Sequence, residues 1–209
     1  MAELPRLNGI IKALEEGSVA FVGSAPADGA AGTNAPYDGA LFEMEHGPYD
    51  IRALQDGLQS MLDRRQIAQR GIAPAVTPII RIPPNQGQTN WVAKQVLDIG
   101  VYGIIWPHID TVEEAYNAVA AMRYPRVEGR PLREPFGRRG DAPNRAVTYW
   151  GITQQEYWLF RNMILASIHG HFRPIPHESA SCSMSSEHAY PALEGRKDMS
   201  AGFALRQRL

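Results

Sequence analysis

Four short apolar runs, most of them separated by segments of helical periodicity, constrain the fold of this chain more than any other feature. The runs cover residues 18–22, 38–44, 76–82 and 101–106. They are apolar almost throughout, which is typical of strands that are buried on both faces. The segments 51–69 and 91–99 instead repeat their apolar residues about every 3.6 positions, as an amphipathic helix does. This alternation predicts an α/β fold with a parallel sheet covered by helices.

The rest of the chain divides into three further helices, two irregular segments and a divergent end. Helices are expected at 7–16, from Thr111 as N-cap to about Met122, and from Thr153 onward. Residues 25–35, rich in Ala and Gly, could form at most a short helix, and 123–145 is expected to be a loop. From Leu159 the strand–helix alternation stops. We therefore expect a β/α unit over residues 1–157 and a divergent, weakly structured segment over 158–209.

Composition narrows the classes of function. A net charge of -1 over 209 residues lacks the basic excess typical of proteins dedicated to nucleic acid or to membrane surfaces. Cys182 is the only cysteine, so an internal disulfide is impossible and a reducing compartment is expected. There is no secretory signal pattern and no apolar stretch of the roughly 20 residues that span a bilayer. The cytoplasm is the expected location, with neither nucleic acid nor membrane as partner.

Ionisable side chains stand where three of the expected strands end. The second strand closes on Phe42-Glu43-Met44-Glu45-His46 before Gly47-Pro48 breaks it. The third ends at Arg81, and the fourth at Trp106-Pro107-His108. Because the carboxyl ends of parallel strands meet at one edge of a sheet, where α/β folds place their chemistry, these side chains predict an active-site rim.

His46 and Arg81 are the candidates for chemistry at this rim. A neighbouring carboxylate, from Glu45 or Glu43, raises the basicity of an imidazole and fixes its tautomer, as a general base requires. The alternative is a surface histidine in an acidic turn. A guanidinium at a buried strand end suits binding of a carboxylate or an enolate oxygen, and its alternative is an ion pair with a glutamate of a neighbouring strand. Trp106 is a further candidate for substrate contact, although packing explains an indole there equally simply, and His108 alone is ambiguous.

Two other groups of residues favour no specific site. Seven arginines lie between 123 and 145, but interspersed acidic residues dilute their charge and no aromatic series accompanies them. A solvated, partly anion-facing loop is expected there. The histidines at 169, 171, 177 and 188, with Cys182, match no usual zinc spacing.

Several motifs, in the same order, resemble the HpcH/HpaI aldolase/citrate lyase family over about Asn8 to Tyr157. They are Phe42-Glu43-Met44-Glu45-His46, Pro78-Ile79-Ile80-Arg81-Ile82-Pro83-Pro84, the run from Gln95 to Pro107, and the run from Ala115 to Pro125. The resemblance implies a (β/α)8 TIM-barrel type, here a partial barrel with about four clear parallel strands. It also implies a carbon-carbon lyase that works on a 2-oxo acid through an enolate, and a homo-oligomer in intact relatives.

The same resemblance implies roles for the rim residues. His46 matches the position of the family's base, Glu43 that of the orienting carboxylate, and Arg81 that of the arginine that contacts the substrate oxygens. The expected reaction is retro-aldol cleavage of a hydroxy-2-oxo acid to pyruvate and an aldehyde, with a divalent metal (Mg, Mn or Co). Acyl-CoA ester lyases of the same family are an alternative, because they also work through an enolate.

The resemblance stops where the family's acidic metal ligands are expected. Glu178, Glu187, Glu194 and Asp198 lie in that part of the chain, but none ends an apolar strand, so no metal ligand is assigned. A complete barrel also needs ~250 residues. A truncated or frame-shifted gene would explain both departures. The alternative function is accordingly a non-catalytic remnant, or an interaction partner of a full-length aldolase.

Overall fold

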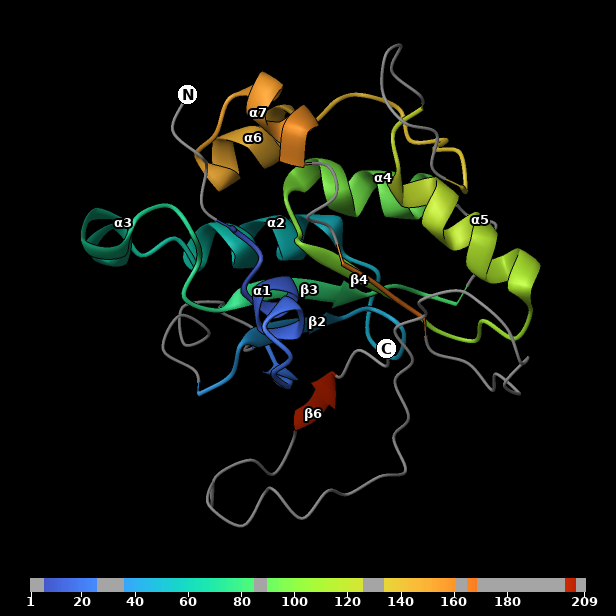
Figure 1. Ribbon diagram of the computed structural model, residues 1–209, viewed down its shortest axis with the longest axis horizontal. Helices are drawn as coiled ribbons and strands as arrows, with labels where there is room; N and C mark the ends of the chain where they lie inside the picture. Colours follow the sequence, from blue (N-terminus) through green and yellow to red (C-terminus); the bar gives the residue numbers. More distant parts are fainter. Residues whose placement is uncertain are drawn as a thin grey trace.

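The computed structural model describes residues 6–25, 36–84, 90–125, 134–160, 165–168 and 202–205 (Figure 1). Its helices are α1 (Gly9–Glu15), α2 (Ile51–Ser60), α3 (Arg64–Arg70), α4 (Asn90–Ile99), α5 (Val112–Met122), α6 (Asn144–Trp150) and α7 (Gln154–Phe160). Its strands are β1 (Ala20–Ser24), β2 (Gly39–Glu43), β3 (Thr77–Arg81), β4 (Gly103–Trp106), β5 (Leu165–Ile168) and β6 (Gly202–Leu205). None of these helices has the length and apolarity needed to cross a membrane.

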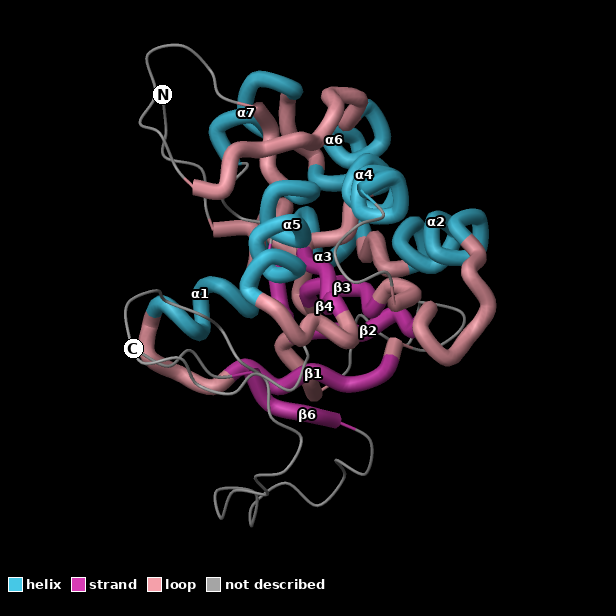
Figure 2. The backbone as a smooth tube through the Cα atoms, turned by 90° about the vertical axis from the view of Figure 1, so that its right-hand side faces the viewer, coloured by secondary structure: helices cyan, strands magenta, loops and turns pink. Residues whose placement is uncertain are grey.

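The strands form one sheet in the order β5-β4-β3-β2-β1-β6. Each neighbouring pair from β1 to β5 is parallel, whereas β6 runs antiparallel to β1. Figure 2 shows β6 at the edge of the sheet, beside β1. The four predicted strands are thus confirmed as β1 to β4, and β5 extends the parallel series by one. Parallel strands that follow one another in chain order, with helices between them, are the arrangement of a (β/α)8 barrel.

The two faces of the sheet are covered differently, because successive residues of a strand point to opposite sides. The larger core lies between the sheet and α2, α4 and α5, and includes Leu54, Leu58, Ile80, Val96, Ile104, Trp106 and Ala118. The smaller core lies between the other face and α1, and includes Ile10, Leu14, Val22, Ile79 and Ile105. Arg81 follows Ile79 by two residues, so it projects from the α1 side of the sheet, beyond that smaller core.

Most predicted helices are confirmed, and their ends have clear causes. Thr111 caps α5, since its hydroxyl accepts from the Glu114 N–H at 3.1 Å while the Glu114 carboxylate accepts from the Thr111 N–H at 3.0 Å. The single helix expected over 51–69 is wrong, because Asp63 starts a new helix. Its carboxylate accepts from the N–H groups of Arg65 and Gln66, so the segment divides into α2 and α3.

The region 123–145 departs most from its prediction as a solvated loop. The side chain of Arg139 is fully buried, with its Nη2 2.7 Å from Asp98 Oδ1 and 2.9 Å from the hydroxyl of Tyr157. Its guanidinium also lies over the ring of Tyr124, 4.7 Å from the centroid. One arginine of the expected anion-facing loop therefore joins α4, α7 and the end of α5. Asp98 compensates its charge and the Tyr157 hydroxyl accepts from Nη2, while Nε and Nη1 have no hydrogen-bond partner among the described residues.

The carboxyl segment is described only in part. β5 and β6 lie within it and join the same sheet, although no regular strand–helix alternation was expected after Leu159. The remaining acidic residues and histidines considered as metal ligands lie outside the described residues, as do residues 26–35. The boundary between 157 and 158 stays a prediction.

Candidate active site

Glu43 and Arg81 stand side by side at the carboxyl ends of β2 and β3. The parallel register pairs their Cα positions directly. The Glu43 Oε2 atom lies 2.7 Å from Arg81 Nε and 2.5 Å from Nη2, so one carboxylate oxygen engages two atoms of the guanidinium. The ion pair with a neighbouring strand's glutamate, one of the two interpretations of Arg81, is therefore present.

The other oxygen of Glu43 shapes the turn that carries His46. Oε1 accepts hydrogen bonds from the backbone N–H groups of Glu45 at 2.6 Å and of His46 at 3.2 Å. Partial burial by itself would raise the pKa of Glu43, but the hydrogen bonds from Arg81 and from these two N–H groups outweigh it and lower the pKa. Glu43 is thus held as a carboxylate and orders the backbone around His46.

This lowered pKa predicts how Glu43 contributes to stability. A carboxyl group whose pKa is lower in the folded state stabilises the fold fully above its unfolded value, about pH 4.3, and loses that contribution as the pH falls through the folded value. Glu43→Gln is therefore expected to reduce the free energy of unfolding more at pH 6 than at pH 3, as measured by urea unfolding. Asp56→Asn, at an exposed position of α2, is the control. An equal loss at both pH values would contradict the expectation.

Glu45 is the central side chain of the site. Only 5% of its side chain is exposed, and both of its oxygens have partners. Oε2 lies 2.9 Å from Arg81 Nε and 3.5 Å from His46 Nε2, and Oε1 lies 3.0 Å from His108 Nε2. The two imidazoles are largely exposed, at 74% and 64% of their side chains. The buried carboxylate of Glu45 thus links Arg81, at the end of β3, with His46 and His108, which follow β2 and β4.

The structure brings together three of the four predicted site residues. His46, Glu43 and Arg81 meet around Glu45, although the carboxylate nearest the His46 ring is that of Glu45. Trp106 does not join them: its indole is fully buried among the core residues, and its Nε1 lies 3.2 Å from Met122 Sδ. It has no exposed surface with which to contact a substrate, because it points to the helical face of the sheet.

The sequence analysis considered Glu45 only as a possible carboxylate neighbour of His46 and left His108 ambiguous, so neither was assigned to the site. For Glu45 a signal existed, since it follows Glu43 by two residues and so points to the same side if the extended chain continues. The signal for His108 was weaker. Pro107 separates it from β4, and its backbone adopts a φ of 53°, a left-handed conformation that the residue type alone did not predict.

The described residues do not form a divalent-metal site. No group of three or more His, Cys, Asp or Glu side chains in the described ranges is arranged to hold a metal ion. The two carboxylates at the rim already have partners: the Oε2 atom of each engages Arg81, Glu43 Oε1 accepts from two backbone N–H groups, and Glu45 Oε1 faces His108. The acidic residues between 169 and 201 lie outside the described part of the chain.

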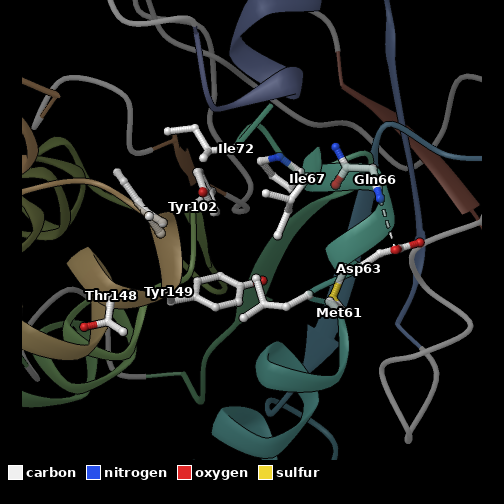
Figure 3. A pocket seen from close by; sticks show the side chains of 12 residues that line it. Met61, Asp63, Gln66, Ile67, Ile72, Tyr102, Thr148 and Tyr149 are labelled. Atoms are coloured by element: carbon white, nitrogen blue, oxygen red, sulfur yellow. Dashed lines mark hydrogen bonds between the residues drawn. The ribbon is translucent and has the colours of Figure 1, made fainter. Parts of the chain in front are cut away.

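A separate cavity lies at the opposite end of the sheet. Its volume is about 130 Å³, and it is bordered by the connection between α2 and α3, by residues that precede β3 and β4, and by α6. Figure 3 shows Met61, Ile67, Tyr102 and Tyr149 around it. The carboxyl ends of the strands, with Glu43, Glu45 and Arg81, do not border this cavity. It is therefore independent of the rim site.

Comparison with known proteins assigns the chain to a family. The family model described as HpcH/HpaI aldolase/citrate lyase matches residues 18–158. The chain is similar to the hydroxypyruvate/pyruvate aldolase of Roseobacter denitrificans, with 36% identity over 107 residues, 51% of this chain and 33% of that protein. It is also similar to the 5-keto-4-deoxy-D-glucarate aldolase of Escherichia fergusonii, with 31% identity over 128 residues, 61% of this chain and 41% of that protein.

Solved structures agree with this assignment. A HpcH/HpaI aldolase/citrate lyase family protein from Burkholderia cenocepacia matches with a TM-score of 0.58 and 26% identity, over 77% of this chain and 58% of that one. The predicted barrel type is thereby confirmed, as part of a barrel. The chain spans only 33% and 41% of the length of the two curated relatives above. It nevertheless belongs to the HpcH/HpaI aldolase/citrate lyase family, because the family model covers more than half of it.

Proposed function

We propose that this chain carries the rim of a carbon-carbon lyase site, at which a hydroxy-2-oxo acid is cleaved to pyruvate and an aldehyde. The observation that carries the proposal is the fixed guanidinium of Arg81 beside the imidazole of His46, joined through Glu45 at the carboxyl ends of β2 and β3. Both relatives described above are named as aldolases, which supports an aldol-type reaction.

Arg81 is suited to contact the oxygen on which negative charge develops. Two carboxylates hold its Nε and Nη2 atoms, while Nη1 has no hydrogen-bond partner among the described residues. A guanidinium that is already oriented loses little entropy when it binds an oxyanion, so it stabilises an enolate more effectively than a mobile side chain. We assign Nη1 of Arg81 to the enolate oxygen of the 2-oxo acid.

His46 is suited to act as the base. Its ring is exposed to incoming substrate, and its Nε2 faces the carboxylate of Glu45. In the proposed reaction the imidazole removes the proton of the C4 hydroxyl, the C3–C4 bond breaks, and its electron pair forms the enolate of pyruvate as the aldehyde leaves. Return of a proton to C3 then yields pyruvate, which balances the reaction. Cleavage of an acyl-CoA ester would use the same enolate, so the rim residues alone do not distinguish the two substrates.

Exchange of the pyruvate methyl protons with deuterium tests this proposal directly. The chain is incubated with pyruvate in D₂O, with and without Mg²⁺ or Mn²⁺, and the methyl signal is followed by NMR. Exchange is expected for the unaltered chain, and His46→Gln is expected to slow it by roughly 100-fold or more, the usual effect of losing a general base. Unchanged exchange in a folded His46→Gln variant would refute the role of His46.

A second function is favoured by one observation, which is that the chain spans only 33% and 41% of the length of the two curated relatives. On this alternative the chain is a non-catalytic partner of a full-length relative. Absence of exchange by the unaltered chain, together with formation of a defined complex with a full-length aldolase in size-exclusion chromatography, would support it. Exchange by the purified chain alone would exclude it.

A further inference from the structure

Three polar atoms around Arg139 are buried without a hydrogen-bond partner among the described residues: Nε and Nη1 of Arg139 and the hydroxyl oxygen of Tyr124. The side chain of Arg139 is fully buried, and its guanidinium lies over the Tyr124 ring, 4.7 Å from the centroid, so the three atoms belong to one cluster. Buried N–H and O–H groups nearly always have a partner in folded proteins, because an unsatisfied donor loses its bonds to water without replacement. The cluster therefore requires an acceptor that the described residues do not supply.

The planar shape of the guanidinium determines where the acceptors must lie. Its N–H groups point outward in one plane. Nη2 already has both of its acceptors, Asp98 Oδ1 at 2.7 Å and the Tyr157 hydroxyl at 2.9 Å. The N–H of Nε lies along one side of the group beside Nη2, whereas Nη1 lies on the other side of Nη2. No single small molecule can accept from both, so Nε and Nη1 each need an acceptor of their own.

The charges nearby exclude an ion as the acceptor, since Asp98 already compensates the charge of Arg139. Burial raises the pKa of Tyr124 and Arg139 lowers it. The charges of Asp98 and Asp141 raise this pKa further, so two carboxylates act on this position against one guanidinium. A further buried anion would be uncompensated, and the guanidinium would repel a cation. The acceptor is therefore neutral, and it is small, because no part of the Arg139 side chain reaches solvent.

We propose that this cluster is a site for internal water molecules, which accept from Nε and Nη1 of Arg139 and bind the Tyr124 hydroxyl. Water suits the site because a buried water typically makes about three hydrogen bonds to polar groups that have no other partner. Asp98 belongs to α4, Tyr124 follows α5, and Tyr157 belongs to α7. The bound water thus completes a polar junction that holds α7, the last helix before β5, against the helices that cover the sheet.

Removal of single hydroxyl groups distinguishes a hydrated cluster from a dry one. In a dry cluster, Tyr124→Phe removes an unsatisfied buried hydroxyl, so stability stays the same or increases. With a water partner, the same substitution removes a hydrogen bond, and the equilibrium constant for unfolding is expected to rise roughly 2- to 10-fold. Tyr157→Phe is the matched control, because it removes a hydroxyl that accepts from Arg139 Nη2. Urea unfolding of the unaltered chain and the two variants measures the difference.

A high-resolution crystal structure of the unaltered chain tests the proposal without any variant. One peak of single-atom density is expected at hydrogen-bonding distance from Nε of Arg139, and another from Nη1. Density for a larger anion at either position would overturn the inference. So would a carbonyl or carboxylate oxygen of the protein in place of the water, or a guanidinium with no density beside these two atoms.

The unfolding data supply an independent decision. Both water peaks, together with a loss of stability in Tyr124→Phe, would establish the hydrated junction. Equal or greater stability of Tyr124→Phe, alongside a loss in Tyr157→Phe, would show that the Tyr124 hydroxyl has no partner and would contradict the proposal. Neither measurement depends on lyase activity, so this inference can fail while the proposed function holds, and the reverse is equally true.

Discussion

An Arg139→Ala variant is expected to lose about 3–5 kcal/mol of its free energy of unfolding, the usual cost of removing one partner of a buried ion pair. The substitution would leave Asp98 without its cation, remove the donor to the Tyr157 hydroxyl, and open a void beside the Tyr124 ring. Single domains are stable by only about 5–15 kcal/mol, so this loss would unfold a large share of the molecules near 37 °C. Urea unfolding followed by tryptophan fluorescence measures it.

The adjacent residue supplies a matched control. Arg138 is exposed, and in the described part of the chain its side chain makes one long hydrogen bond, of 3.4 Å, to Asn117. Arg138→Ala keeps the backbone and is expected to change stability by less than about 0.5 kcal/mol. The double variant Arg139→Met with Asp98→Leu should recover much of the loss, because an apolar pair can replace a buried ionic one. Equal effects of Arg138→Ala and Arg139→Ala would show that the burial of Arg139 contributes nothing.

Replacing Arg81 by methionine is expected to slow pyruvate methyl exchange by roughly 10²–10³-fold, which is the cost of losing one oriented donor to an oxyanion. Methionine preserves much of the side-chain length, but it leaves Glu43 and Glu45 facing each other without a cation. Arg81→Lys keeps the positive charge but cannot donate to two carboxylates and to the substrate in one plane, so an intermediate loss is expected. The exchange rate with saturating pyruvate separates this effect from weaker binding.

The same substitution on an exposed arginine provides the comparison. Arg65→Met on α3 lies on a surface that does not border the rim, so its exchange rate should match that of the unaltered chain. Each variant is first checked for native unfolding behaviour. Full activity in a folded Arg81→Met variant would rule out this guanidinium as the oxyanion contact.

The parts of the fold that were predictable are those in which local pattern and tertiary structure agree. Apolar runs became β1 to β4 because strands buried on both faces need apolar residues at every position. The rim position of His46 and Arg81 followed from a single rule, that parallel strands end at the same edge. Direct pairing of Glu43 with Arg81 also required the register of β2 and β3, which a sequence does not display.

The parts that were not predictable depend on contacts between distant segments. The residues adjacent to Arg139 in the sequence do not distinguish it from a surface arginine. It is buried because the fold brings Asp98 and Tyr157, which lie 41 and 18 positions away, into contact with its guanidinium. His108 likewise belongs to the site only because the fold brings Glu45, which is distant in the sequence, to within 3.0 Å of its Nε2. The apolar periodicity of residues 51–69 continues across Asp63, so it predicted one helix instead of two. A hydrophobic pattern indicates which face of a helix is buried, but it does not indicate where a capping residue ends one helix and starts another.

The antiparallel strand β6 connects the carboxyl-terminal part of the described chain to β1, the first strand of the sheet. Residues 20–23 and 202–205 are partners in one ladder, so force applied on the carboxyl side of β6 acts first on the hydrogen bonds between β6 and β1. Because β1 separates β6 from β2 in the sheet, rupture of this ladder would leave the pairing of β2 with β3, and with it the Glu43–Arg81 ion pair, in place.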